Sequence, residues 1–157
     1  MRVGLKGNFR LRFRVGYVVI TRTEKFIPAS ILNLLKAKPA VVYGRGEERR
    51  DWIYVDDNCS GILAAMLTGK SGHIYHFGGG SYPLRNIDII RSLFKRTCSG
   101  DNYLAYINFI KDPRPGHDFK YHLDIVGKTS AALEWLPKVT VWQGLDMTVE
   151  WYKKNAQ

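Results

Sequence analysis

Short apolar segments separated by proline and glycine constrain this 157-residue chain more than any other feature. Helix-like and strand-like stretches alternate along it, and turn residues such as Pro39, Gly44 and Gly69 separate them. No single stretch is long enough to bury its apolar face alone, so the stretches must share a core. The pattern therefore predicts an α/β domain with a small mixed sheet and flanking helices.

The expected elements follow from the period of the apolar residues, which is near two in strands and near 3.6 in helices. Strand-like or extended stretches are expected at 11–15, 17–20, 41–43, 50–55, 73–77 and 103–110. Helices are expected at about 28–38, 58–68, 86–95, 124–135 and 143–153.

Helix starts are expected where a short polar side chain can accept a backbone hydrogen bond. By this criterion Asp56 or Asp57 caps the helix at 58–68, and Asn86 and Asp124 cap the two helices that follow. Large apolar residues of a helix normally face the core. In the helix at 58–68 the residues expected to face the core are Ile62, Leu63, Met66 and Leu67.

The net charge of +10 is concentrated at the start of the chain. Residues 1–25 hold seven Lys or Arg against Glu24 alone, a net +6, whereas the other 132 residues hold 17 basic and 13 acidic side chains, a net +4. A segment of this kind can attract nucleic acid or acidic lipid through its summed field. It is also typical of a poorly packed tail, which is the reading that we favour.

Several classes of protein find no support in the sequence. It has no run of eighteen apolar residues, and residues 1–25 lack the apolar core of a signal peptide. Its two cysteines, Cys59 and Cys98, form neither a disulfide framework nor a metal knuckle, and its histidines lack metal-ligand spacing. We therefore expect a cytoplasmic protein that has no metal site and no contact with a membrane.

Two arginines stand in positions suited to anion binding. Arg50 lies where a turn meets a strand, and Arg114 lies between two prolines in a loop that continues with Gly116. Proline and glycine give such a loop a defined shape, and arginine offers a permanently charged, forked donor that matches a pair of phosphate oxygens. Surface ion pairs would explain both arginines equally well, and the residues alone leave the two readings open.

Four motifs together resemble the C-terminal half of dTDP-glucose 4,6-dehydratases, which are extended short-chain dehydrogenases/reductases. They are Glu-Lys-Phe-Ile-Pro at 24–28, Arg-Asp-Trp-Ile-Tyr-Val-Asp-Asp at 50–57, Arg-Pro-Gly-His-Asp at 114–118 and Thr-Val-Glu-Trp-Tyr at 148–152. The resemblance implies a nucleotide-sugar-binding domain at 24–157 that lacks the full Rossmann domain. Residues 1–23 are expected to be a basic leading segment that does not match the family.

The resemblance also implies a set of substrate-binding residues. Lys25 would lie near the substrate, Val41, Val42 and Tyr43 would line the nucleobase, and Arg50, Arg114 and His117 would hold the diphosphate. His76 stands where the family usually has asparagine, and Pro113 is an addition to the usual Asp-Arg sequence.

The catalytic machinery of the family is missing from this sequence. It has no glycine-rich dinucleotide motif between a strand and a helix, and none of its nine tyrosines is followed by lysine four residues later. We therefore expect no catalytic residue and no cofactor bound by this chain alone, although the intact family uses NAD. The expected partners are a dTDP-hexose, a separate cofactor-binding half and further copies of the chain. The alternatives are a basic nucleic-acid-binding module and a non-functional gene fragment.

Overall fold

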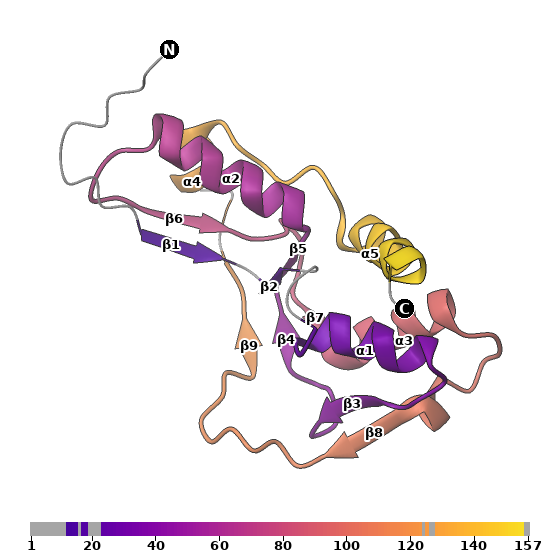
Figure 1. Cartoon of the computed structure of the whole chain (residues 1–157). Helices are drawn as coiled ribbons and strands as arrows, with labels where there is room; N and C mark the ends of the chain where they lie inside the picture. Colours follow the sequence, from indigo (N-terminus) through magenta and orange to yellow (C-terminus); the bar gives the residue numbers. More distant parts are fainter. Residues whose placement is uncertain (1–11, 16, 19–22, 124, 126–127, 156–157) are drawn as a thin grey trace.

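The computed structural model describes residues 12–15, 17–18, 23–123, 125 and 128–155 (Figure 1). Short strands and helices alternate, which confirms the predicted α/β class with small sheets and flanking helices. The strands are β1 (Arg12–Val15), β2 (Tyr17–Val18), β3 (Ala40–Tyr43), β4 (Arg49–Arg50), β5 (Trp52–Ile53), β6 (Ile74–Phe77), β7 (Leu84–Arg85), β8 (Ile107–Ile110) and β9 (Lys120–Tyr121). The helices are α1 (Phe26–Leu35), α2 (Val55–Thr68), α3 (Asn86–Thr97), the 3-10 helix η1 (Tyr103–Tyr106), α4 (Lys128–Leu133) and α5 (Val141–Asn155).

Within the described residues the strands form four small sheets. Three are parallel pairs, β1 with β6, β2 with β5 and β3 with β8, and the fourth has the order β7-β4-β9. In that sheet β4 runs antiparallel to β7 and parallel to β9. Because β1 and β2 pair with strands from the middle of the chain, residues 12–15 and 17–18 of the basic leading segment are part of the fold and not a loose tail.

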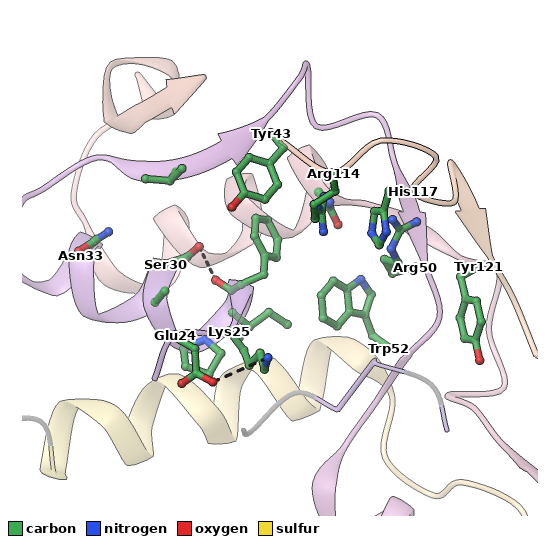
Figure 2. Close-up of a pocket in the computed structure, with 16 residues that line it drawn as sticks. Glu24, Lys25, Ser30, Asn33, Tyr43, Arg50, Trp52, Arg114, His117 and Tyr121 are labelled. Carbon is green, nitrogen blue, oxygen red and sulfur yellow. Dashed lines mark hydrogen bonds and ion pairs between the residues drawn. The ribbon is translucent and has the colours of Figure 1, made fainter. Parts of the chain in front are cut away.

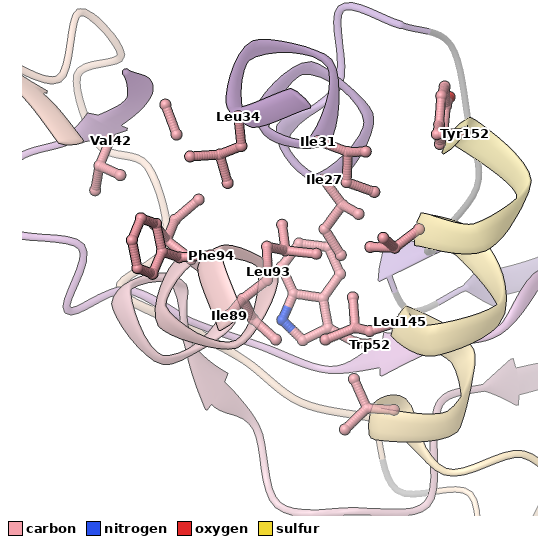
Figure 3. Packing of buried hydrophobic residues seen from close by; sticks show 14 residues of the cluster. Ile27, Ile31, Leu34, Val42, Trp52, Ile89, Leu93, Phe94, Leu145 and Tyr152 are labelled. Carbon is pink, nitrogen blue, oxygen red and sulfur yellow. The ribbon is translucent and has the colours of Figure 1, made fainter. Parts of the chain in front are cut away.

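A large core lies between α1, α3 and α5 (Figure 3). Helix α1 contributes Ile27, Ile31 and Leu34, spaced four and three residues apart on one face. Trp52 of β5 belongs to the same cluster. This packing fixes α1 beside β3, so the beginning of the helix and the end of the strand are held near each other. The remaining buried members are Ala40, Val42, Ile89, Ile90, Leu93, Phe94, Val141, Leu145, Val149 and Tyr152.

A smaller core joins α2 and α4 to β6, and here the predicted face of α2 is wrong. Leu63, Met66 and Leu67 are 54%, 55% and 67% exposed, and Ile62 is half-buried. The helix instead buries Gly61 and Ala65. Small residues occupy the buried face because α2 lies close to two aromatic rings. A methyl group on Gly61 would come within 2.6 Å of Phe77 and 2.9 Å of Trp135. The small core consists of Ile53, Ala65, Tyr75, Phe77, Leu133 and Trp135.

The predicted helix caps are also wrong where the structure tests them. Helix α2 starts after Tyr54 and α3 after Arg85, and neither has a side-chain cap. Asp57 is buried and accepts hydrogen bonds from the backbone N–H groups of Lys138 and Val139, at 3.0 and 2.8 Å. It therefore ties α2 to the segment before α5. Asp124 lies outside the described residues.

Two further boundaries differ from the expectation. The stretch 103–110 begins as η1 and becomes strand only at Ile107, and α4 starts at Lys128, later than predicted. The other predicted elements are confirmed, with ends that differ by a few residues. None of the helices described is both long and apolar enough to cross a bilayer.

Candidate functional site

A pocket of about 820 Å³ opens between the first turns of α1, the end of β3, the β4–β5 strands and the loop before β9 (Figure 2). Lys25 and Glu24 lie at its α1 side, and Arg50, Arg114 and His117 gather at another side. Polar donors and apolar walls thus surround one volume, as in small-molecule sites. The lining residues are Glu24, Lys25, Phe26, Ile27, Pro28, Ala29, Ser30, Asn33, Val41, Tyr43, Arg50, Trp52, Asn86, Arg114, His117 and Tyr121.

Strand alternation explains why consecutive residues 50–52 have different roles. Arg50 and Trp52 line the pocket, while Asp51 between them points to the other side, as the strand period of two requires. The Asp51 carboxylate is buried and accepts the N–H groups of Gly79 and Leu123 at 2.8 and 3.1 Å. Burial raises the pKa of Asp51, and these two hydrogen bonds and the nearby imidazole of His122 oppose that rise. Asp51 is a structural residue that holds the strand on which Arg50 is mounted.

Arg50 is held tightly in the pocket wall. The residue is 3% exposed, and its Nη1 donates to the carbonyl of Arg49 at 2.8 Å and to that of Phe119 at 3.4 Å. Strand pairing places Arg50 in register with Tyr121 of β9, which also lines the pocket. A guanidinium in so buried a place needs hydrogen-bond acceptors. The structure therefore presents a fixed cation at this wall.

Arg114 is placed by an ion pair and an aromatic ring. Its Nε and Nη2 donate to the two carboxylate oxygens of Asp112, each at 2.8 Å, and its guanidinium lies 4.5 Å from the ring centroid of Tyr43. The hydrogen bond from Arg114 holds the pKa of Asp112 down at about 2, with a smaller contribution from the charge of His117. The arginine fork and the Tyr43 ring therefore form one unit on the pocket wall.

Helix α1 contributes its amino-terminal end to the pocket. Lys25 occupies the N-cap position and forms an exposed ion pair with Glu24 at 3.7 Å. No side chain caps the helix, and its first residues 26–30 line the pocket. The unsatisfied N–H groups and the positive end of the helix dipole favour anions here. They reinforce the charges of Arg50 and Arg114.

Asn86 lines the pocket, although the sequence pattern indicates only a helix cap at this position. It was expected to cap α3, but it is the first residue of that helix and lines the pocket. Its side-chain oxygen Oδ1 is buried and has no hydrogen-bond partner among the described residues. A buried amide oxygen without a donor costs free energy, so it suits a ligand that brings a hydroxyl or N–H group. Its position at a turn gave no signal of this in the sequence.

The structure brings six of the eight sequence-predicted site residues into one pocket: Lys25, Val41, Tyr43, Arg50, Arg114 and His117. Val42 is fully buried in the large core, since neighbours in a strand point to opposite sides, so its side chain faces away from the pocket. His76 lies in β6, outside the lining, and its backbone N–H donates to the hydroxyl of Thr129 at 2.8 Å.

Gly78 and Gly79 of the glycine run 78–80 pack closely against the chain's own β4–β5 segment. A methyl group on Gly78 would come within 2.5 Å of the Asp51 carboxylate, and one on Gly79 within 1.8 Å of the Trp52 carbonyl. The close approach that these two glycines permit is therefore used by the chain's own β4–β5 segment.

Comparison with known proteins shows that the chain is similar to part of the dTDP-glucose 4,6-dehydratases and related epimerases. A sequence model of the NAD dependent epimerase/dehydratase family matches residues 14–78, and this match starts within the segment that we expected not to resemble the family. The dTDP-glucose 4,6-dehydratase of Salmonella typhimurium is 38% identical over 138 residues, which are 85% of this chain and 37% of that protein. The enzyme of the same name from Streptomyces niveus is 37% identical over 132 residues, which are 84% and 38% of the two chains.

Solved structures agree with the sequence matches. A dTDP-glucose 4,6-dehydratase from Streptomyces venezuelae, solved with NAD bound, superposes with a TM-score of 0.83 at 33% identity and covers 92% of this chain and 44% of that one. A UDP-glucuronic acid 4-epimerase from Bacillus cereus gives a TM-score of 0.80 at 28% identity, with 92% and 45% covered. The chain thus spans less than half the length of these relatives.

Proposed function

The chain is similar in sequence and in fold to part of the dTDP-glucose 4,6-dehydratases, and from this premise we propose that its pocket binds a nucleotide sugar such as a dTDP-hexose. In this proposal the chain corresponds to the C-terminal, substrate-recognising half of such an enzyme. It supplies recognition of the nucleotide and the diphosphate and does not catalyse a reaction alone.

The observation that carries the proposal is the convergence of Arg50, Arg114 and the Tyr43 ring on one pocket. These residues come from two strands and a loop that lie far apart in the sequence. We call Arg50 and Arg114, held on one pocket, the arginine clamp. A diphosphate would bridge the two guanidinium groups through charge-assisted hydrogen bonds, each contributing roughly 1.5–3 kcal/mol. Lys25 and the amino terminus of α1 add positive potential on the neighbouring wall.

The nucleobase would lie against Val41 and Tyr43, next to the Arg114 guanidinium that lies over the Tyr43 ring. Asn86 would accept a hydrogen bond from the ligand through its otherwise unpartnered Oδ1. A pocket of about 820 Å³ is within the usual range of about 300–1,000 Å³ for small-molecule sites. The proposal therefore gives Tyr43, Asn86 and the two arginines complementary roles in one site.

We propose further that the chain alone binds NAD weakly or not at all. The sequence has neither the dinucleotide motif nor the Tyr-x-x-x-Lys pair, and the glycine run packs against the chain's own backbone. A hydride acceptor would have to come with another polypeptide or another segment. Calorimetric titration with NAD is expected to show no micromolar binding, and a micromolar affinity would falsify this part of the proposal.

The arginine clamp is tested by titrating dTDP into the chain and into Arg50→Ala, Arg114→Ala and the double variant. Each single change is expected to weaken binding about ten- to a hundred-fold, since a factor of ten corresponds to about 1.4 kcal/mol. The double change should cost less than the sum of the two, because both arginines hold the same anion. Arg114→Lys should recover binding only in part, since it keeps the charge and loses the fork.

Arg45→Ala provides a matched control, because this arginine is largely exposed and pairs only weakly with Glu47 at 3.9 Å. Removing it changes the net charge as much as removing Arg114 does, yet dTDP affinity should stay within two-fold. If Arg114→Ala binds dTDP as the unchanged chain does, the clamp is wrong.

Nucleic-acid binding is the second candidate, and the basic charge of the leading segment favours it. Deleting residues 1–11 decides between the two, because the deletion removes Arg2, Lys6 and Arg10 and keeps strand β1. A nucleotide-sugar site should survive this deletion. Binding to nucleic acid should depend steeply on salt and should weaken, because three of the seven basic residues at 1–25 are removed.

A further inference from the structure

The carboxylate of Asp112 contacts both the side chain and the backbone of Arg114. Asp112 accepts three hydrogen bonds from Arg114: from Nε at 2.8 Å, from Nη2 at 2.8 Å and from the backbone N–H at 2.9 Å. Both side chains are partly exposed, 42% for Arg114 and 24% for Asp112, so the pair lies at the pocket surface and not in the core.

The loop around this pair depends on the same contact. Pro113 and Pro115 flank Arg114, and neither has a backbone N–H to donate. Of these three residues only Arg114 can donate a backbone hydrogen bond, and it donates to Asp112. Gly116 follows with φ of +70°, a conformation that favours glycine. The carboxylate thus holds both the backbone and the side chain of Arg114.

We propose that Asp112 is the positioning residue of the phosphate-binding arginine. It fixes the guanidinium over the Tyr43 ring, at 4.5 Å from the centroid, before any ligand arrives. A free arginine side chain would have to lose its rotamer freedom when the ligand binds, and Asp112 removes that cost in advance. The inference rests on the proposed function and goes beyond it, because it assigns to a negative residue a favourable effect on the binding of an anion.

The sign of that effect separates this role from simple electrostatics. Asp112 is a full negative charge near the expected diphosphate, and on Coulomb grounds its removal should strengthen anion binding. If its main effect is to position Arg114, its removal should weaken the binding. The pKa of Asp112 is held at about 2, so its carboxylate is charged near neutral pH. A change in dTDP affinity in the Asp112 variants then reports loss of the carboxylate and not a change in its protonation.

The experiment titrates dTDP and thymidine into the full chain and into Asp112→Ala, Asp112→Asn and Asp118→Ala. Asp118 is exposed, lies in the same loop and does not line the pocket, so Asp118→Ala serves as the charge control. We expect Asp112→Ala to weaken dTDP binding roughly three- to ten-fold, the cost of immobilising one long side chain. Asp112→Asn should be intermediate, Asp118→Ala should be neutral or slightly tighter, and thymidine should be affected less than dTDP.

A measurement without ligand accompanies the titrations. The ¹⁵N NMR signal of the Arg114 Nε–H group should be protected from exchange with water in the unchanged chain and should lose that protection in Asp112→Ala, because Asp112 accepts this proton. Unchanged or tighter dTDP binding by Asp112→Ala would overturn the inference while leaving the proposed function intact. If the unchanged chain binds no dTDP at all, both the inference and the proposed function fail.

Discussion

At the scale of single residues, hydrogen-bond partners and position in the strand or helix separate the groups that hold the fold from those that line the pocket. Asp51 and Asp57 are buried carboxylates that accept backbone N–H groups from distant segments, whereas Arg50 and Arg114 direct their charge to the pocket. The family resemblance singled out the two arginines, because the residues alone left an anion site and surface ion pairs equally open. The sequence pattern placed Asp57 wrongly, because a polar residue near a helix start looks like a cap whether or not its acceptor is used elsewhere.

The role of Asp57 predicts a large effect of one substitution. Asp57→Ala should lower the free energy of unfolding by about 1–3 kcal/mol, because the N–H groups of Lys138 and Val139 lose their acceptor in a buried place. Chemical denaturation measures this. The neighbouring Asp56 is exposed, so Asp56→Ala should be nearly neutral, and equal losses in both variants would contradict the assignment.

At the scale of elements, the alternation of short strands and helices was predictable and the packing faces were not. Periodicity located α1, α3 and α5, each of which contributes large apolar residues to the core. It failed for α2, because the apolar period reports which residues are hydrophobic and not how closely a neighbour approaches. There the neighbours are the rings of Phe77 and Trp135, and only small residues fit.

Gly61→Ala tests the close packing of α2. Alanine is the better helix former, yet its methyl group would lie 2.6 Å from Phe77, and overpacking of this kind costs about 1–3 kcal/mol. We therefore expect a lower midpoint of thermal unfolding. Met66→Ala removes a 55% exposed side chain from the same helix and should change the midpoint little. A stabilised Gly61→Ala variant would show that the rings do not restrict this face.

At the scale of the whole molecule, large apolar side chains of α2 are exposed. Leu63, Met66 and Leu67 form an exposed apolar strip on α2. Strand β6 packs on the buried side of this helix, and among the described residues its parallel sheet contains one other strand, β1. Parallel sheets are normally larger and covered on both faces. Four motifs indicated the residues of the pocket. The apolar period predicted that Leu63, Met66 and Leu67 face the core, so it gave no signal of the exposed strip.

This strip predicts self-association of the isolated chain. Sedimentation velocity should show a concentration-dependent increase in mass, and replacing both Leu63 and Leu67 by lysine should reduce it without changing dTDP affinity, because neither residue lines the pocket. Trp151→Lys is the control, since Trp151 is 50% exposed on another helix. A strictly monomeric chain with a sharp thermal transition would contradict the prediction.

The central claim is that one pocket recognises a nucleoside diphosphate, and an NMR titration of the ¹⁵N-labelled chain with dTDP tests it most directly. The account predicts that amide signals of 25–33, 41–43, 50–52, 86 and 114–121 shift together and saturate at one dissociation constant, because these segments line the same volume. Signals of α2 and α4 should stay in place. Shifts confined to the leading segment 1–23, or no shifts at millimolar dTDP, would contradict it.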